Sequence, residues 1–250
     1  MVDWDRGAYE DTASELLPAA EQVVQRAAIK EGQAVLDLGT GTGNAALLAA
    51  KAGAEITAVD PSPRLLNVAE ARIRQGRFEV AKAEDLPFDD ESFDRVLSLF
   101  AVIFSEQPQK AAKEITRVLK KDGRALITAW EPVGPMAGAL GVLGAAAAKA
   151  SGLPQRERFG WGEPAKVEAL FDRARVETER VEITFPAVSA EDYLERFESG
   201  HPAGILFRET LTRAGNYGEI REQAKLALGD GQSITSSYFI YTVSSPRSAA

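Results

Sequence analysis

The chain has 250 residues, and its 37 Asp and Glu outnumber its 29 Lys and Arg, so the formal charge at pH 7 is −8. Proteins that bind nucleic acid draw much of their affinity from neutralising phosphates, so this acidic chain is a poor candidate for such binding. It has no Cys and one His, which excludes disulfides, thiolate chemistry and multi-histidine metal centres. We therefore expect a globular protein with a small-molecule partner and no metal.

The start of the chain, MVDWDRGAYEDT, lacks the basic and then apolar pattern of a signal peptide. The longest weakly polar run, residues 136–148, is too short to span a bilayer. We expect a cytoplasmic protein with no membrane partner, either a monomer or a homodimer.

Taken in chain order, the first half alternates helix and strand signals. Apolar residues at helical spacing between Leu16 and Ala27 predict a leading helix. Ser62-Pro63 starts a later helix that Gly76 closes, and a third spans Pro108 to Lys121, with Asp122-Gly123 as the turn out of it. Strands are predicted at 34–38, 55–60, 77–83, 93–100 and 123–130. This alternation is typical of a doubly wound, Rossmann-like α/β fold with a parallel sheet.

The second half has a different pattern. Residues 131–165 are rich in Pro and Gly and predict a lid insertion without strands. Strands at 176–185 and 236–243 would end the sheet in an antiparallel pair, with a helical insertion at 187–232 between them. We expect one domain over 1–250, with a disordered tail at 244–250.

The segment VLDLGTGTGNAALLAA holds the most informative motif. A strand runs directly into Gly39, Gly41 and Gly43 and then into a helix, and glycine is needed where the backbone turns sharply beneath a ligand. Asp60 ends the next predicted strand, and in a parallel sheet its carboxylate lies beside the glycine loop, within reach of two ribose hydroxyls. The motif therefore predicts a site for a nucleoside-containing cofactor.

Two classes of cofactor use such a loop with an acidic partner. A dinucleotide places its pyrophosphate at the helix N-terminus, where a nearby carboxylate repels it. Asp37 precedes Gly39 by two residues and suits a cationic or zwitterionic ligand instead. Asn44 also stands where the dinucleotide fingerprint requires Gly or Ala. The loop thus favours a sulfonium or ammonium ligand, with an NAD(P)-dependent oxidoreductase as the alternative.

Four linked segments, VLDLGTGTG, ITAVDPSPRLL, AKAEDLPFDDESFDRVLSLF and EITRVLKKDGRALIT, resemble the class I S-adenosylmethionine (SAM) dependent methyltransferases, in particular the small-molecule branch near the ubiquinone/menaquinone C-methyltransferases. The resemblance spans residues 30–130 and implies a seven-stranded, mostly parallel sheet with a C-terminal antiparallel strand. It also implies SAM as cofactor and S-adenosylhomocysteine as product.

Carried over by position, the resemblance places the methionine moiety at the glycine loop, the ribose at Asp60 and the adenine beside Pro61, Ser62 and Ala83. The implied cofactor residues are Asp37, Gly39, Thr40, Gly41, Gly43, Asp60, Pro61, Ser62, Ala83, Glu84 and Leu99. The family usually has Asp or Asn before the Ala, to accept from the adenine amino group. Here that residue is Lys82, which has no acceptor, and Glu84 or Asp85 would have to substitute.

The acceptor is expected beyond the carboxyl ends of the strands, in a mainly apolar pocket. Its predicted residues are Phe100, Ile103, Trp130, Met136, Phe159 and Trp161. Ile103 and Phe104 replace the paired histidines of some relatives. The catalytic residue is unknown, with His201 and Tyr9 as weak candidates. His201 lies in a turn-like stretch. Tyr9 is expected either to fold over the cofactor, as the N-terminal segment does in some relatives, or to pack beneath the leading helix.

The sequence hypothesis is therefore a methyltransferase that passes a methyl group from SAM to O, N or C of a small, partly apolar metabolite by in-line displacement. The alternatives are an NAD(P)-dependent oxidoreductase and a non-catalytic SAM-binding protein.

Overall fold

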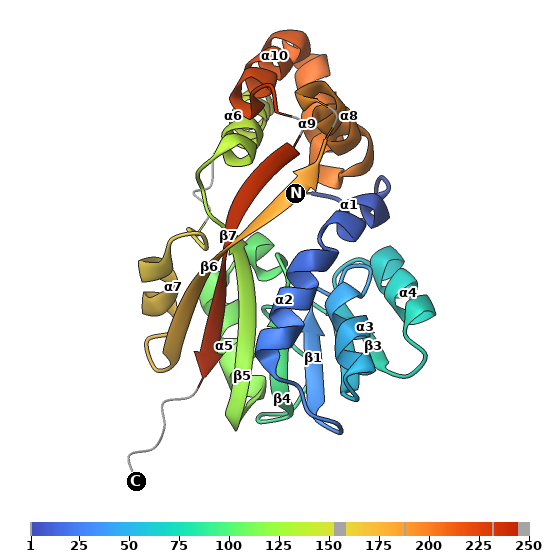
Figure 1. The fold of residues 1–250 in the computed structure, drawn as a ribbon, viewed down its shortest axis with the longest axis vertical. Coiled ribbons are helices and arrows are strands. Elements are labelled where there is room, and N and C mark those ends of the chain that lie inside the picture. Colours follow the sequence, from blue (N-terminus) through green and yellow to red (C-terminus); the bar gives the residue numbers. More distant parts are fainter. Residues whose placement is uncertain (1, 153–158, 188, 232, 245–250) are drawn as a thin grey trace. The chain divides into compact units, whose positions relative to one another are not determined.

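The computed structural model describes residues 2–152, 159–187, 189–231 and 233–244. Its sheet has seven strands in the order β3-β2-β1-β4-β5-β7-β6 (Figure 1). The strands are β1 (Ala34–Leu38), β2 (Glu55–Asp60), β3 (Arg77–Val80), β4 (Phe93–Ser98), β5 (Leu119–Trp130), β6 (Arg175–Pro186) and β7 (Ser233–Ser244). Neighbouring strands from β3 to β5 pair in parallel, and β7 pairs antiparallel with β5. The predicted fold class is confirmed.

Residue contacts divide the chain into two compact units. We call residues 16–130, 159–181 and 238–250 the sheet unit, and residues 1–15, 131–158 and 182–237 the helical unit. Strands β6 and β7 each contribute residues to both.

Helices cover both faces of the sheet unit. They are α2 (Leu17–Ala27), α3 (Asn44–Lys51), α4 (Pro63–Arg72), α5 (Pro108–Val118) and α7 (Pro164–Leu170), with a 3₁₀ turn η1 (Val102–Phe104). Helices α2, α3 and α4 lie on one face and α5 and α7 on the other (Figure 1). This is the expected result when each crossover between parallel strands is right-handed.

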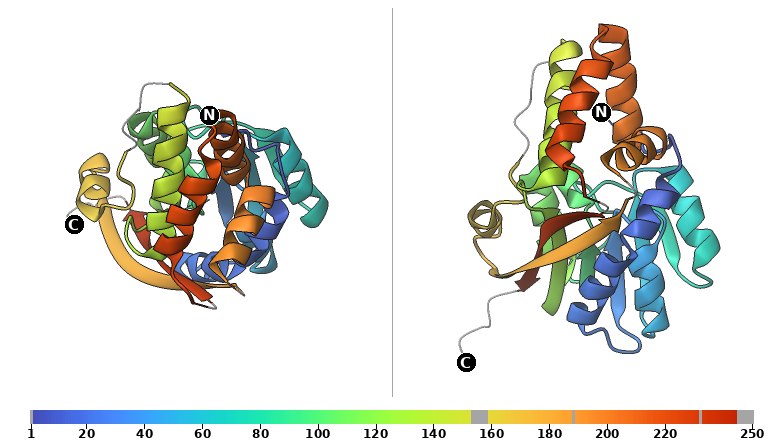
Figure 2. Two further views of the ribbon diagram at one scale, coloured as in Figure 1. Left: turned by 90° about the horizontal axis from the view of Figure 1, so that it is seen from above. Right: turned by 45° about the horizontal axis from the view of Figure 1, so that its top comes forward.

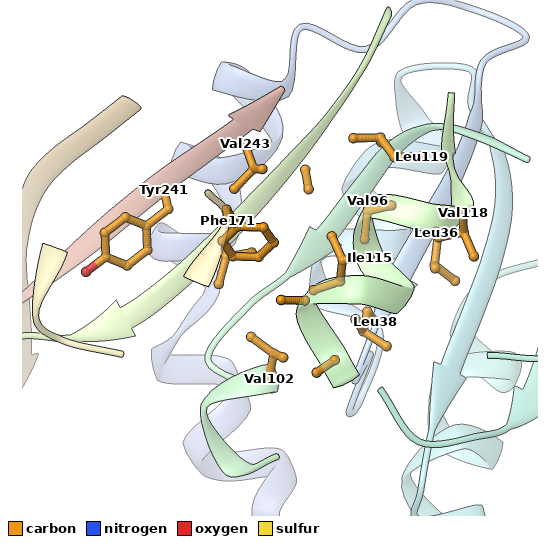
Figure 3. Close-up of a cluster of buried hydrophobic side chains, with 14 of the residues drawn as sticks. Leu36, Leu38, Val96, Val102, Ile115, Val118, Leu119, Phe171, Tyr241 and Val243 are labelled. Carbon is orange, nitrogen blue, oxygen red and sulfur yellow. The ribbon is translucent and has the colours of Figure 1, made fainter. Parts of the chain in front are cut away.

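Strand periodicity decides which side chains face which helix layer. Leu36, Leu38 and Val96 point toward α5 and pack with Ile115 and Val118 in a buried hydrophobic cluster, which Phe171, Tyr241 and other residues extend (Figure 3). Because successive side chains of a strand point to opposite faces, Asp37 points toward α3 instead. That single alternation positions the first acidic residue of the site.

The helical unit contains α1 (Tyr9–Glu15), α6 (Pro135–Ala150), α8 (Ala190–Gly200), α9 (Pro202–Ala214) and α10 (Tyr217–Leu228). Helix α6 packs against α9 and α10 (Figure 2). A Cβ added at Gly138 would lie 3.6 Å from Cβ of Ala227, and one at Gly144 would lie 3.6 Å from the ring of Phe207, which are ordinary van der Waals distances. The packing of α6 therefore does not require glycine at either position.

Several predicted boundaries were wrong. The third strand ends at Val80 rather than residue 83, and α4 ends at Arg72, because Ile73 is already extended, rather than at Gly76. The predicted turn at Asp122-Gly123 lies inside β5. The register of β5 against β4 jumps from Phe93↔Leu119 to Arg95↔Arg124, so this dipeptide belongs to an irregularity within the strand and does not end a helix. Helix α1 was not predicted.

Within the predicted lid segment, 131–165, α6 forms and the first two residues of α7 lie at its end, while residues 153–158 lie outside the described part of the chain. Of the predicted tail, Ser244 closes β7 and residues 245–250 lie outside the described residues. None of the described helices is long and apolar enough to cross a membrane.

Candidate functional site

The glycine loop connects β1 to α3 and turns through left-handed backbone. Gly39, Gly41 and Gly43 have φ values of 69°, 55° and 85°, which L side chains rarely adopt. A Cβ at Gly39 would also lie 2.3 Å from Cβ of Ala101, which no real structure tolerates without movement. Both observations explain why the turn requires glycine.

Asp37 is buried and holds the start of α3. Its Oδ2 accepts hydrogen bonds from the hydroxyl of Thr40 at 2.7 Å and from the backbone N–H of Ala46 at 2.9 Å. The Ala46 N–H is one of the first-turn donors that have no partner inside a helix, so the carboxylate acts as a remote N-cap. The positive end of α3 is therefore already compensated by a negative side chain.

Burial raises the pKa of Asp37 to about 6, although the hydrogen bonds from Thr40 and Ala46 favour the charged form; the nearby Asp60 carboxylate adds to the rise. Proton uptake by Asp37 is thus expected within the range of mildly acidic buffers.

Asp60 ends β2 and holds the other side of the loop. Its Oδ2 accepts from the N–H of Gly41 at 2.8 Å, and its Oδ1 accepts from the N–H of Ser62 at 2.8 Å. Ser62 in turn caps α4 by accepting from the N–H of Leu65 at 3.1 Å. The carboxylate is consequently fixed in place at the carboxyl edge of the sheet, next to the loop.

The residues predicted beside an adenine ring come from the segments that follow β2 and β3. Pro61 is exposed, Ala83 and Glu84 are half-buried, and Lys82 is exposed. Glu84 accepts from the hydroxyl of Ser105 at 2.6 Å and from the N–H of Glu106 at 3.0 Å. Burial raises the pKa of Glu84, but these hydrogen bonds outweigh it and the net shift is downward.

Aromatic residues gather after β4 and at the end of β5. The rings of Phe100 and Trp130 stack with centroids 3.9 Å apart, and Tyr238 meets Phe100 edge-on at 5.2 Å. Phe100 has a φ of 51°, an uncommon value for a non-glycine residue, and its N–H donates to the hydroxyl of Thr128 at 2.8 Å. Leu99 and Ile103, on either side of Phe100, are half-buried.

Of the residues predicted for the acceptor pocket, Trp161 lies within the core of the sheet unit and Phe159 is half-buried against that core. Trp161 is 3% exposed and belongs to the hydrophobic cluster beside α5, and its carbonyl accepts from the hydroxyl of Tyr241 at 2.8 Å. Phe159 packs against it edge-on, with ring centroids 5.2 Å apart. Met136 is buried in α6 of the helical unit.

The two weak catalytic candidates meet in the helical unit. His201 lies 5.6 Å from Tyr9 and 5.6 Å from Trp4, both edge-on, and stacks on Phe197 at 4.9 Å, measured between ring centroids. Its Nδ1 accepts from the N–H of Ala203 at 3.1 Å and so caps α9, which assigns the proton of the neutral ring to Nε2. Burial lowers the pKa of His201 to about 4, so the ring is neutral at pH 7.

The sequence reasoning missed contacts that depend on tertiary packing. Arg72 of α4 reaches the glycine loop, and Thr128 of β5 accepts from Phe100. The only sequence signal for Arg72 is a basic residue in the last turn of a helix, which says nothing about the loop that it reaches. Within the described part of the chain, no group of three or more His, Asp and Glu side chains is arranged to hold a metal ion.

Comparison with known proteins finds similarity to methyltransferases. Residues 36–127 match the family model described as a methyltransferase domain. An uncharacterized protein from Mycobacterium tuberculosis is 40% identical over 136 residues, covering 52% of this chain and 50% of that protein. A demethylmenaquinone methyltransferase from Thermotoga maritima is 44% identical over 95 residues, covering 37% of this chain and 42% of that protein. The chain spans about half the length of the curated relatives that it matches.

Among solved structures, a SAM dependent methyltransferase from Aquifex aeolicus superposes with a TM-score of 0.52 at 15% identity, covering 92% of each chain. At that identity the likeness concerns the fold. The family match covers β1 to β5, and so includes the glycine loop, Asp37 and Asp60. Residues 36–127 of this chain therefore match the methyltransferase domain family, and the sheet around them has the fold of a solved SAM dependent methyltransferase.

Proposed function

We propose that this protein transfers a methyl group from SAM to a small, partly apolar metabolite. The observation that carries the proposal is the pair of buried carboxylates beside the glycine loop, Asp37 in β1 and Asp60 at the end of β2. Asp37 already compensates the helix N-terminus on which a dinucleotide would seat its pyrophosphate. This argues against the NAD(P)-dependent alternative.

The residues fit a SAM molecule in donor and acceptor chemistry. Both oxygens of Asp60 accept backbone hydrogen bonds, which hold the carboxylate in place, and a carboxylate is an acceptor of the kind that a ribose hydroxyl requires. In the sheet order, β2 lies between β1 and β3, so a ligand with its ribose at Asp60 extends toward the glycine loop on one side and toward Ser62 and Ala83 on the other. We assign the amino-acid end to the loop and the adenine to the β3 side.

SAM bound there would supply an activated methyl group on a sulfonium. The protein's own part is to bind, orient and exclude water. Asp60 fixes the nucleoside, the loop fixes the amino-acid end, and the stacked rings of Phe100 and Trp130 provide apolar surface after β4 and β5. We propose that Leu99, Phe100, Ile103 and Trp130 face the acceptor, because the first three follow the carboxyl end of β4 and Trp130 is the last residue of β5.

His201 is the one histidine of the chain, but its surroundings make it a poor general base. Its Nδ1 is engaged by Ala203, and aromatic rings surround it. We therefore propose that His201 and Tyr9 serve the packing of the helical unit, and that alignment of the acceptor supplies most of the rate.

Calorimetry tests the proposal directly. We expect S-adenosylhomocysteine to bind and NADH and NADPH to give no heat. Incubation with SAM and metabolite fractions should then add the mass of one methyl group to an acceptor. Binding of NADH in place of S-adenosylhomocysteine would support the oxidoreductase, and binding without any methylated product would support the non-catalytic alternative.

A further inference from the structure

We propose that Arg72 is a positioning residue for the cofactor, and that it acts on the amino-acid end of the ligand rather than on the nucleoside. The inference rests on the proposed function and goes beyond it, because neither the glycine motif nor the acidic residues involve α4's last turn. Arg72 closes that helix, well separated in sequence from the loop that it reaches.

The guanidinium holds the two residues that flank Gly43. Its Nη1 donates to the carbonyl of Thr42 at 2.5 Å, to the hydroxyl of Thr42 at 3.1 Å and to Oδ1 of Asn44 at 3.1 Å. Thr42 is 3% exposed, so these bonds orient a residue that is itself buried. Charged donors make stronger hydrogen bonds than neutral ones, and this donor contacts both the backbone and the side chain of one loop residue.

Helix α4 is held against the loop at more than this one point. A Cβ added at Gly43 would lie 3.0 Å from Cβ of Ala69, one turn before Arg72, so the loop and the helix are in close contact. At the other end of α4, the N–H of Ser62 donates to Asp60. The same helix therefore supports the ribose carboxylate at its N-terminus and the glycine loop at its C-terminus.

The backbone hydrogen bonds of the loop engage most of its peptide groups. The N–H groups of Gly39 and Thr40 donate to the carbonyl of Val59 at 2.8 and 2.9 Å, that of Gly41 donates to Asp60, and that of Gly43 donates to the carbonyl of Thr40 at 2.8 Å. Within the described part of the chain, the carbonyl of Gly41 accepts no backbone hydrogen bond and the N–H of Thr42 donates none.

These two groups belong to the peptide that links Gly41 to Thr42, and Arg72 holds Thr42 by its carbonyl and its hydroxyl. The C=O and N–H of a trans peptide point in opposite directions, so one of these two groups can face the amino-acid end of the ligand. The carbonyl would accept from the ammonium, or the N–H would donate to the carboxylate. Loss of Arg72 would free Thr42 to rotate and would remove this pre-oriented group, whereas Asp60 would keep its own hydrogen bonds.

The test compares two ligands that share a nucleoside. S-adenosylhomocysteine carries the amino-acid end, and 5′-methylthioadenosine lacks it. Dissociation constants for both are measured by calorimetry on the full chain as wild type, Arg72→Gln, Arg72→Lys and Arg74→Gln. Arg74 is an exposed arginine two residues further on and serves as the matched control.

For Arg72→Gln we expect the dissociation constant of S-adenosylhomocysteine to rise about tenfold and that of 5′-methylthioadenosine to rise less than about twofold, as for the loss of one charge-assisted contact. Arg72→Lys should recover part of the affinity, because Nη1 alone makes all of these bonds, and Arg74→Gln should match wild type.

An equal loss for both ligands would show a general structural role and would overturn the inference, as would no loss at all. A wild-type protein that binds neither ligand would instead overturn the proposed function. Melting temperatures without ligand identify a variant that is merely unfolded. If Arg72→Gln is unfolded, the dissociation constants of the two ligands for Arg72→Lys decide between the outcomes.

Discussion

The sheet unit holds a fully buried ionisable group and the helical unit a half-buried one, and they offset the cost of desolvation in opposite ways. In the sheet unit, Asp37 receives hydrogen bonds from Thr40 and Ala46, which favour its charged form. In the helical unit, His201 is enclosed by Trp4, Tyr9 and Phe197 and stays neutral. A buried charge that organises a loop indicates a ligand site, whereas a half-buried neutral ring that caps a helix indicates packing.

The largest expected loss of stability comes from a substitution in the glycine loop. Gly39→Ala should destabilise the protein by about 2–4 kcal/mol, the sum of left-handed strain and overpacking against Ala101. Chemical denaturation measures the change. Gly32→Ala is the matched control, because Gly32 also has a positive φ but nothing within 4 Å of an added Cβ, and it should cost only about 1–2 kcal/mol. Equal losses for the two variants would mean that Ala101 yields easily.

The next largest effect concerns Asp60, the carboxylate that we propose binds the ribose. Asp60→Asn should weaken S-adenosylhomocysteine binding about ten- to hundredfold, since charge-assisted bonds to ribose are worth about 1.5–3 kcal/mol. It should weaken 5′-methylthioadenosine equally, in contrast to Arg72→Gln. Asp89→Asn removes an exposed charge and is the control. Unchanged affinity in Asp60→Asn would place the ribose elsewhere.

Acidification should change the stability of the two units in opposite directions. The pKa of Asp37 is raised above its unfolded value, so its contribution to stability is fully present below pH 3.8 and is lost as the pH rises through about 6. The pKa of His201 is lowered, so its contribution is present above pH 6.5 and is lost as the pH falls toward about 4. Between pH 6.5 and 4, acidification should therefore loosen α9 while Asp37 favours the folded loop.

Amide exchange, expressed as protection factors for peptides from α9 and from β1–α3, measures both trends. His201→Gln should remove the acid sensitivity that arises at α9, and Asp37→Asn should remove the opposing trend at the loop. Parallel changes of the two segments, unaffected by either substitution, would rule out this assignment of the two groups.

The sequence predicted the sheet unit much better than the helical unit, for physical reasons. Strands β1 and β2 are largely buried; Gly39 follows β1, and β2 ends at Asp60. The apolar runs and the residues that end them therefore predict the same strand boundaries. The Asp122-Gly123 error arose because a turn-forming dipeptide can also sit in an irregular strand. Helix α1 and the rings around His201 depend on contacts between distant segments, which local patterns do not contain.

The same limit applies inside the candidate site. Glycine spacing and Asp60 could be predicted because the loop demands particular residue types. The hydrogen bond from Ala46 to Asp37 could not, because it requires the direction in which the side chain leaves β1 to be combined with the position of α3. Arg72 was missed for a similar reason, since α4 must be packed before its last turn meets the loop.

The smallest expected effect concerns surface charge. Arg26 and Glu179 form an ion pair at 2.5 Å, but Glu179 is 55% exposed. Arg26→Gln should therefore change stability by less than about 1 kcal/mol, and the difference should shrink in high salt. Denaturant titrations at low and high salt check both points, and a larger, salt-independent loss would show that the arginine stem contributes packing of its own.

The alternation of the two units along the chain has a practical consequence for protein engineering. Because the backbone passes from one unit to the other repeatedly, neither unit is an uninterrupted stretch that could be expressed or exchanged by a single cut. A chimera that imports the helical unit of a relative must splice three separate stretches and preserve the pairing of β5 with β7. Altering this protein one residue at a time is the more tractable route.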